Sequence, residues 1–357
     1  MVVFVHLCWF SLSLCKETLC IESEKETLLK LKHSLKDPSN LLSSWNVSAN
    51  PNCCQWVGVV CNNVTSHVEE LDLSTGLFNR FEPFQGTIPD VWGNITSLVW
   101  LDFSYHQLEG LIPTSLGSVT SLVVLDLSNN LLEGPIPTSF GNLSSLVTLD
   151  VSNNKLKGSI PTFLQNVTSL VTLDLSHNQL EGPITISLGS MISLDTLDLS
   201  NNQFEGPIPS SLGNVTSLAT LDLSNNQLEG SIPTFSGSVT SLIELNLSYN
   251  KLSSLTDQFG VYESISILDF SNNKIGGEFP KSLGKLSSLT QLSVSKNQLS
   301  GNPFETLRLL YGLIILDIGD NHFEGVVMED HLSNLTRLKE FYASGNNFTL
   351  KVGKYAI

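Results

Sequence analysis

Basic residues are scarce in this chain of 357 residues. It holds 18 lysines and arginines against 34 aspartates and glutamates, which gives a formal net charge of −16 at pH 7. A nucleic-acid partner requires a basic footprint, and an anionic membrane surface attracts basic segments. The charge balance therefore argues against both partners.

Long apolar runs are almost absent as well. The single run that stands out is Val2–Cys15. Its length is well below the roughly 20 residues that a helix needs to span a bilayer. We expect a secretory signal peptide over about residues 1–19, although no lysine or arginine stands near Met1. We expect no membrane span within this chain, and a secreted or cell-surface location.

Cysteine is absent after Cys61. Two of the six cysteines lie in the expected signal peptide, and the other four form an even set, which in a secreted protein indicates disulfides. Four cysteines allow three pairings, and a bond between the adjacent Cys53 and Cys54 would close a strained ring. We favour Cys54 with Cys61 and Cys20 with Cys53. A zinc site is the weaker alternative, because His67 lacks the spacing of a zinc ligand.

Catalytic motifs are missing too. The chain contains no Gly-x-Ser-x-Gly element, no phosphate-binding loop and no histidines at metal-ligand spacing. We therefore expect no enzyme activity, no cofactor and no bound metal.

One phrase, L-x-x-L-x-L-x-x-N-x-L-x-G-x-I-P, occurs about twelve times. An early copy starts at Val68, and the copies from Leu98 to Leu242 follow one another in steps of 24 residues. Such a period indicates a solenoid, whose coils bury their apolar sides against neighbouring coils. We expect repeats over residues 68–350 and, over residues 351–357, an end without a C-terminal cap. The later copies start at Ile265, Leu289, Leu313 and Leu338.

Each copy contains a short strand pattern. In the copy that starts at Leu122, Leu125 and Leu127 should point inward, whereas Asp126 and Ser128 should point outward. Stacked copies would place these strands about 4.8 Å apart in a parallel sheet. The predicted fold is an α/β-type solenoid, a superhelix with a parallel β-sheet on its concave face.

An asparagine recurs where the chain turns after each strand. A stacked column of carboxamides would satisfy the buried backbone groups of these turns, which is a structural role. His106 takes this place in the copy that starts at Leu98. The column consists of Asn130, Asn154, Asn178, Asn202, Asn226, Asn250, Asn273, Asn297, Asn321 and Asn346.

The segment over residues 20–67 precedes the repeats. Leu28 and Leu31 recur at helical spacing, and Ser23 with Glu26 fits a capping box at the start of a helix. The first coil of a solenoid has no neighbour on its outer side. We expect this segment to cover that side as a helical N-terminal cap stapled by disulfides.

The outward strand positions are the candidates for ligand binding. An aspartate ladder at one of them could attract a cationic ligand, but the repeat phrase itself contains Leu-Asp-Leu-Ser, and we favour duplication as its origin. Exposed aromatic residues often anchor ligands, although Trp100 has the alternative role of closing the first coils. The candidate concave binding face consists of Trp100, Asp102, Tyr105, Asp126, Asp150, Asp174, Asp198, Asp222, Glu244, Tyr249 and Asp269.

Nine Asn-x-Ser/Thr sequons are candidate glycosylation sites. Five of them lie four residues before a strand leucine, so their glycans would line one edge of the solenoid and leave the other edge free. Asn246 lies on the strand face itself, where we expect less glycosylation. The sequons are Asn46, Asn63, Asn94, Asn142, Asn166, Asn214, Asn246, Asn334 and Asn347.

Two patterns resemble a known family. The repeat phrase is similar to the plant-specific leucine-rich repeat. SLKDPSNLLSSWN, followed by CCQWVGVVC and HVEELDL, resembles the N-terminal cap of plant receptor-like proteins and receptor-like kinases. The double cysteine and the His67-Val68 start look most like receptor-like proteins of the fungal-elicitor and disease-resistance type. The resemblance implies a leucine-rich-repeat superhelix and a cell-surface immune or developmental ectodomain. It also implies an extracellular protein, peptide or glycan ligand and a possible co-receptor kinase.

The sequence departs from that family at its end, where it has no cysteine-bearing C-terminal cap, membrane helix, cytoplasmic tail or kinase motif. We therefore expect a truncated receptor, located at the plasma membrane if a membrane helix lies downstream. Two alternatives stay open. One is a secreted inhibitor resembling plant polygalacturonase-inhibiting proteins, which carry such a cap. The other is a non-functional receptor fragment.

Overall fold

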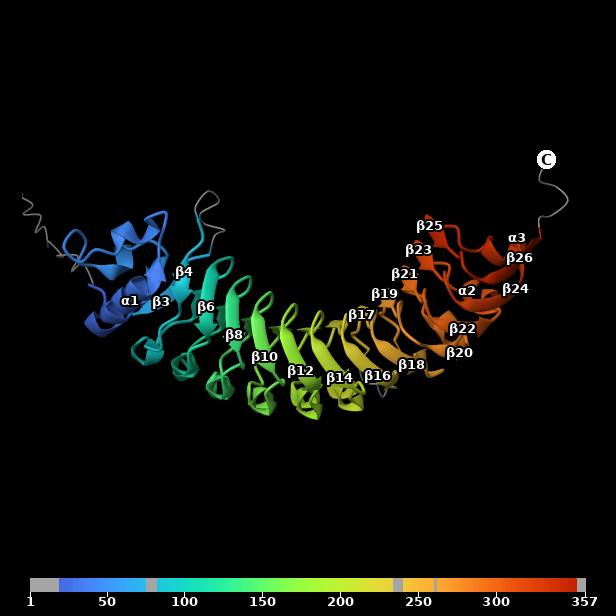
Figure 1. The fold of residues 1–357 in the computed structure, drawn as a ribbon, viewed down its shortest axis with the longest axis horizontal. Helices are drawn as coiled ribbons and strands as arrows, with labels where there is room; N and C mark the ends of the chain where they lie inside the picture. The colour runs from blue at the N-terminus through green and yellow to red at the C-terminus, as the bar shows by residue number, and fades with distance from the viewer. Residues whose placement is uncertain (1–18, 75–81, 234–239, 260–261, 352–357) are drawn as a thin grey trace, which may run out of the picture.

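A computed structural model describes residues 19–74, 82–233, 240–259 and 262–351. Figure 1 shows them as one curved arc of stacked coils, with helix α1 (Glu22–Ser34) near one end and strand β26 (Asn347–Lys351) near the other. Within the described residues the strands form two sheets of 13 strands each. The expected solenoid with a parallel sheet on its concave face is confirmed.

The first sheet contains the L-x-L segments. Its strands β2 (Val59–Cys61) and β3 (Val68–Asp72) are antiparallel, and the later neighbours are parallel and in register. The labels β17, β19, β21, β23 and β25 follow the inner side of the arc in Figure 1. The other strands are β5 (Trp100–Asp102), β7 (Val124–Asp126), β9 (Thr148–Asp150), β11 (Thr172–Asp174), β13 (Thr196–Asp198), β15 (Thr220–Asp222), β17 (Glu244–Asn246), β19 (Ile267–Asp269), β21 (Gln291–Ser293), β23 (Ile315–Asp317) and β25 (Glu340–Tyr342).

The second sheet contains the segments around the L-x-G part of each repeat, and the sequence interpretation missed it. Its strands are β1 (Leu35–Lys36), β4 (Gln85–Thr87), β6 (Gln107–Leu111), β8 (Leu131–Gly134), β10 (Lys155–Gly158), β12 (Gln179–Pro183), β14 (Gln203–Gly206), β16 (Gln227–Ser231), β18 (Lys251–Ser254), β20 (Gly276–Glu278), β22 (Gln298–Gly301), β24 (His322–Met328) and β26. Most of its strands have a single buried apolar residue, such as Leu156 in β10, whereas β4, β20 and β26 have none and β24 has two.

Short helices close the coils on the outer side of the arc (Figure 1). Most are single 3-10 turns that begin directly after the proline of the I-P element, because proline fixes φ and lacks an N–H to satisfy. They are η4 (Trp92–Asn94), η5 (Thr114–Ser118), η6 (Thr138–Asn142), η7 (Thr162–Asn166), η8 (Ile186–Ser190), η9 (Ser210–Asn214) and η11 (Lys281–Lys285). Helices α2 (Phe304–Leu307) and α3 (Glu329–Leu332) replace them in later coils.

A leucine seam runs through the stack. Leu122, Leu125 and Leu127 are fully buried, as expected for the inward positions. The expectation that Ser128 points outward is wrong, since its side chain is only 3% exposed. The strand ends at Asp126, and the chain turns at Asn129, whose φ is 55°, so the strand alternation no longer applies at Ser128.

The cap covers the first coil. Helix α1 begins after Ile21 without a side-chain cap, so the capping box expected at Ser23 and Glu26 is wrong. Ser23 lies inside the helix and accepts a hydrogen bond from the Thr27 hydroxyl with its carbonyl. Glu24 is buried instead, and its carboxylate binds Nδ1 of His67 at 2.7 Å and the backbone N–H of Val68 at 2.8 Å. This carboxylate ties α1 to strand β3.

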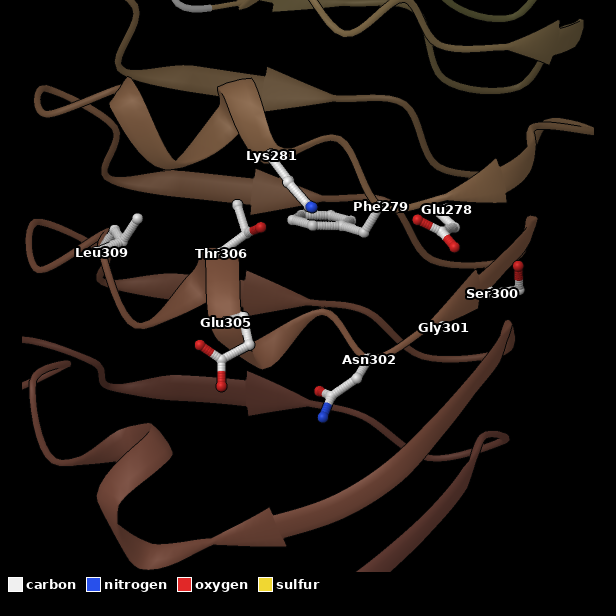
Figure 2. A pocket seen from close by; sticks show the side chains of 9 residues that line it. All are labelled: Glu278, Phe279, Lys281, Ser300, Gly301, Asn302, Glu305, Thr306 and Leu309. Carbon is white, nitrogen blue, oxygen red and sulfur yellow. The ribbon is translucent and has the colours of Figure 1, made fainter.

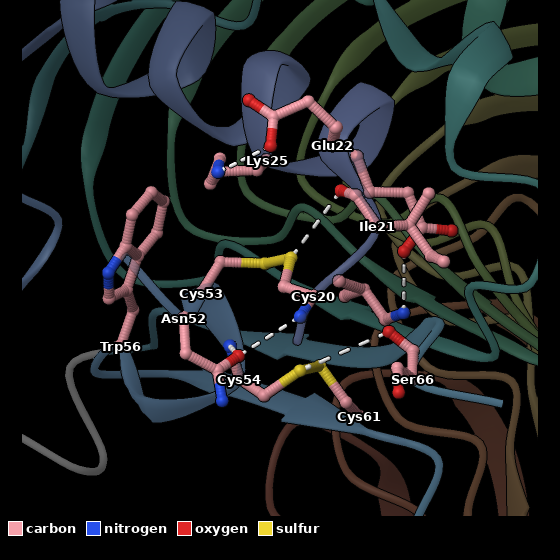
Figure 3. Close-up of a disulfide and its surroundings, with 12 residues drawn as sticks. Cys20, Ile21, Glu22, Lys25, Asn52, Cys53, Cys54, Trp56, Cys61 and Ser66 are labelled. Atoms are coloured by element: carbon pink, nitrogen blue, oxygen red, sulfur yellow. Dashed lines mark hydrogen bonds and ion pairs between the residues drawn. A yellow bond between two sulfur atoms is a disulfide. The ribbon is translucent and has the colours of Figure 1, made fainter. Parts of the chain in front are cut away.

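The two favoured disulfides, Cys20–Cys53 and Cys54–Cys61, are confirmed, with Cα atoms 5.4 Å apart in each (Figure 3). The side-chain oxygen of Asn52 accepts hydrogen bonds from the N–H groups of Cys20 and Cys54. Two further short turns complete the cap, η1 (Leu41–Ser44) and η2 (Cys53–Gln55). The sulfur atoms of Cys20, Cys53 and Cys54 lie within 4.8 Å of one another, but their disulfide bonds leave no thiolate to hold a metal.

The expected signal peptide and the last residues, 352–357, lie outside the described residues, apart from residue 19. Among the helices that the structure describes, none has the length and apolar character to cross a membrane.

Candidate functional site

The solvent-facing side of the first sheet and of the turns that follow its strands is called the concave wall here. The sequence-predicted binding residues all lie on it, from Trp100 on β5 to Asp269 on β19. Neighbouring strands are in register, so that Asp174 lies between Asp150 and Asp198. The structure therefore brings the predicted residues into continuous columns along one wall.

The aspartates of the wall have a structural task. One carboxylate oxygen of Asp126 accepts a hydrogen bond from the N–H of Ser128 at 2.9 Å, and this stabilises the turn after the strand. Asn246 does the same for Ser248 at 3.1 Å. Equivalent bonds, at 2.8–2.9 Å, are made by Asp72, Asp102, Asp150, Asp174, Asp198, Asp222 and Asp269.

Burial changes the charge of this aspartate column. Desolvation raises the pKa of Asp150 to about 6, against the hydrogen bonds from Ser152, and the charges of Asp126 and Asp174 add to the rise. Desolvation likewise raises the pKa of Asp102, Asp126, Asp198 and Asp269. A raised pKa keeps the neutral form to higher pH, so Asp150 adds its negative charge to the wall as the pH rises through about 6.

Two groups of exposed apolar residues lie on the wall or directly before one of its strands, in addition to Tyr342 on β25, which is 53% exposed. The N-terminal apolar cluster consists of Val99, Trp100 and Tyr105, which are 36%, 40% and 60% exposed. The C-terminal apolar cluster consists of Ile243 and Tyr249, which are 49% and 52% exposed. Large apolar side chains this exposed are typical of binding surfaces when they gather in one place.

The sequence interpretation singled out the aromatic members of these clusters and missed Val99 and Ile243. Both occupy the position directly after the first leucine of a copy, which was left out of the candidate columns. Tyr105 and Tyr249 also have positive φ, 61° and 54°, which is costly for a bulky residue. At the same position most regular coils hold asparagine, the residue that tolerates this conformation best.

The asparagine column supports the wall from within the stack. The amide of Asn154 donates to the carbonyls of Leu127 at 2.9 Å and Val151 at 3.2 Å, and its oxygen accepts from the N–H of Leu132 at 2.9 Å. Each side chain thus bonds the backbone of its own and the preceding coil. The same pattern occurs at Asn130, Asn178, Asn202, Asn226, Asn250, Asn273, Asn297, Asn321 and Asn346.

His106 replaces asparagine in this column. Its Nε2 lies 2.6 Å from the carbonyl oxygen of Leu73, and its Nδ1 accepts from the N–H of Phe84 at 3.3 Å. Burial lowers the pKa of His106, which favours the neutral ring that can donate at one nitrogen and accept at the other.

The sequons lie mostly away from the wall. Asn142, Asn166 and Asn214 are the last residues of η6, η7 and η9 on the outer side of the arc. Asn246 differs, because it is half-buried on β17 and its amide donates to the Asp222 carboxylate at 3.0 Å. The side chains at the other eight sequons are exposed: Asn46, Asn63, Asn94, Asn142, Asn166, Asn214, Asn334 and Asn347.

These features define the class of the protein, and comparison with family models agrees. Residues 21–62 match the leucine rich repeat N-terminal domain, and residues 120–180, 193–215, 216–258 and 264–286 match leucine rich repeat models. The chain is a leucine-rich-repeat protein with the N-terminal domain typical of that class.

More particularly, its homologues are plant receptor-like proteins and the ectodomains of leucine-rich-repeat receptor kinases. Receptor-like protein EIX2 from Solanum lycopersicum is 44% identical over 57 residues, which are 16% of this chain and 5% of EIX2. The ectodomain of the receptor kinase GASSHO1/SCHENGEN3 from Arabidopsis thaliana, solved with CASPARIAN STRIP INTEGRITY FACTOR 2, superposes with a TM-score of 0.84 at 33% identity, over 91% of this chain and 41% of that one.

The Arabidopsis receptor kinase HAESA was solved with the peptide hormone IDA and the co-receptor SERK1. It superposes with a TM-score of 0.78 at 31% identity, over 92% of this chain and 54% of that one. The chain thus spans less than two thirds of the length of each of these relatives.

Proposed function

We propose that this chain is an extracellular module that binds an extended, basic peptide on its concave wall. The observation that carries the proposal is the placement of the two apolar clusters on either side of the part of the aspartate column that runs from Asp126 to Asp222. They lie six coils apart, a distance of about 29 Å at the strand spacing of a sheet. An extended peptide of about nine residues covers that distance.

The negative charge of the wall between the clusters determines which side chains fit at the middle of the ligand. Five aspartates from Asp126 to Asp222 follow one another in register. Lysine or arginine side chains at the centre of the peptide would lie against these carboxylates, and apolar side chains at its ends would lie on the clusters. Binding should strengthen as the pH rises through about 6, because the Asp150 carboxyl then becomes charged.

The solved relatives support a peptide as the class of ligand, since HAESA was solved with a peptide hormone and a co-receptor. By analogy we propose that this chain acts in a plant cell-surface receptor system of immunity or development, and that a partner kinase joins once the ligand is bound. Outer-side sequons such as Asn142 and Asn214 would keep glycans away from the concave wall.

The test is a selection of nonapeptides from a random library on the purified chain, followed by affinity measurements by calorimetry. Enriched peptides should carry apolar ends and a basic centre. Trp100→Ala and Tyr249→Ala should each weaken binding about 30-fold, the effect of losing an interface hot spot of about 2 kcal/mol. Tyr311→Ala is the matched control, because Tyr311 is 59% exposed but lies before β23 and off the wall. Equal losses in all three variants, or enrichment of acidic peptides, would refute the proposal.

A further inference from the structure

A hollow of about 340 Å³ lies between two of the later coils, beside the second sheet (Figure 2). It is bounded by strands β20 and β22, turn η11 and helix α2, and it is not part of the concave wall. Its volume is at the lower end of the range for sites that enclose small molecules.

The hollow arises where the repeat pattern changes. In a regular coil, Ile208 is buried and Pro209 starts the 3-10 turn. In the coil that follows β22, Asn302-Pro303 stands in place of the I-P element and α2 replaces the 3-10 turn. The Asn302 side-chain oxygen accepts a hydrogen bond from the N–H of Phe304 at 3.0 Å, which stabilises the start of α2. The hollow is therefore bordered by a segment whose backbone differs from that of the regular coils.

The hydroxyl of Thr306 faces the hollow. Thr306 is only 6% exposed, and its side chain is one of those that line the space. Figure 2 shows its oxygen directed toward the ring of Phe279. Within the part of the chain that the structure describes, this hydroxyl has no hydrogen-bond partner, and its oxygen is not fully enclosed, so it is open to a molecule in the hollow. It offers one donor and one acceptor to a ligand.

The rim offers both donors and acceptors around an apolar floor. Phe279 forms the floor, and around it lie the Lys281 ammonium, the Glu278 carboxylate and the Asn302 amide (Figure 2). Lys281 and Glu278 form no ion pair with any other residue that the structure describes. Their charged groups are therefore free to bond a ligand.

This mixture selects the chemistry of the ligand. The Glu278 carboxylate repels an acidic ligand, and Lys281 repels a cationic one. By contrast, the Glu305 carboxylate is paired with Arg308 at 2.9 Å. A neutral molecule with many hydroxyls can accept from Lys281 and donate to the carboxylates, and each of its hydroxyls can also pair with Thr306. We propose that the hollow binds a neutral saccharide of one or two rings.

The test is saturation-transfer NMR on the whole chain with three groups of probes. Neutral disaccharides (cellobiose, xylobiose and mannobiose) are compared with digalacturonate and with the peptide Gly-Arg-Gly. Each probe is added at about 10 mM, tenfold above a Kd of about 1 mM. Transfer to at least one neutral disaccharide is expected. Transfer to none of them, or to only the charged probes, overturns the proposal.

Variants locate the site. Thr306→Val keeps the shape of the side chain and removes the hydroxyl, so it should weaken saccharide binding about fivefold, as expected for one lost hydrogen bond. Lys281→Met gives a second test at an exposed position, should the first variant fold poorly. Unchanged affinity in both variants overturns the proposal.

Glu181→Gln is the matched control, because Glu181 lines another hollow beside the same sheet, together with Gln203 and Glu205. It should leave saccharide binding unchanged, and a loss equal to that of Thr306→Val would place the saccharide elsewhere and overturn the assignment. Trp100→Ala should also have no effect on saccharide binding, which separates this site from the peptide site of the concave wall.

Discussion

The regular coils that start at Leu98 to Leu218 and the irregular coils that start at Leu242 to Leu338 share one buried seam but differ on their surfaces. In the regular region, the outer segments over residues 111–123, 135–147, 159–171, 183–195 and 207–219 contain one charged residue, Asp195. In the irregular region, the single turn η11 already carries two charged residues, Lys281 and Lys285. The second sheet also changes, because β16 and β18 pair with a register shift.

The comparison teaches that repetition maintains the core, whereas departures from the repeat create distinct surfaces. In the regular region the aspartates recur because the turn needs them, as the bond between Asp126 and Ser128 shows. The Tyr249 side chain and the hollow around Thr306 both occur where the phrase is broken. Among the described residues of the regular coils, the large exposed aromatic side chains are Trp100 and Tyr105, which lie in one coil.

The largest expected effect concerns the asparagine column. Asn178→Ala in the regular region removes bonds to the carbonyls of Val151 and Leu175 and to the N–H of Leu156. It should lower the free energy of unfolding by about 3 kcal/mol, because these backbone groups stay buried without partners. Urea unfolding followed by circular dichroism measures the loss.

The same change at Asn273 serves as the comparison in the irregular region. Asn273 makes similar bonds but is half-buried, so water can reach part of the space that the side chain leaves. The expected loss is about 2 kcal/mol. A loss at Asn178 no larger than that at Asn273 would contradict the idea that the regular coils are the more tightly closed ones.

A smaller effect is expected at Asp150, whose pKa burial raises from 3.8 to about 6. Because the pKa of Asp150 is higher in the folded than in the unfolded protein, protonation of this carboxyl stabilises the folded state. The stabilisation is complete below pH 3.8 and is lost as the pH rises through about 6. Asp150→Asn should therefore be neutral near pH 4. At pH 7 it should raise stability by about 1 kcal/mol, after allowance for the solvent screening of a half-buried group.

The chain itself offers the control for this prediction. Asn246 already occupies the aspartate column and bonds Ser248 in the same way, so asparagine fits the turn. Asn246→Asp should have the opposite effect and destabilise the protein at pH 7 but not near pH 4. Thermal unfolding at both pH values measures the two variants, and a pH-independent difference would count against desolvation as the cause.

The smallest expected effect concerns glycosylation and leaves folding unchanged. Asn214 is exposed at the end of η9, whereas the Asn246 amide is half-buried and bonded to Asp222. Glycopeptide mass spectrometry of the secreted protein should find Asn214 largely occupied and Asn246 largely unoccupied. Full occupancy at Asn246 would mean that glycans stand on the concave wall, in conflict with its proposed use.

The solenoid is predictable because the same leucine-containing phrase returns every 24 residues over much of the chain. The cap disulfides are predictable because only four cysteines remain for pairing in the secreted chain. The second sheet is not predictable from the sequence. Strands such as β10 contain a single buried leucine and therefore show no hydrophobic alternation of their own. The predictions of an outward Ser128 side chain and of a capping box at Ser23 and Glu26 are wrong. Both depend on the exact residue at which a strand ends or a helix begins, which the sequence pattern does not determine.

The candidate site is only partly predictable. The aromatic members of the apolar clusters stand out from the monotonous columns, but the pKa rise at Asp150 depends on burial by neighbouring coils. The hollow at Thr306 requires packing between Phe279 and α2. Nothing in the sequence around Thr306 indicates that its hydroxyl lacks a partner.

Hydrogen–deuterium exchange of the chain, with and without a selected basic nonapeptide, tests the central claim most directly. Protection should appear in the odd-numbered strands of the first sheet from β5 to β17 and in the turns that hold Tyr105 and Tyr249, whereas exchange in the second sheet should stay unchanged. Protection confined to the second sheet or to the outer turns would contradict the proposed role of the concave wall.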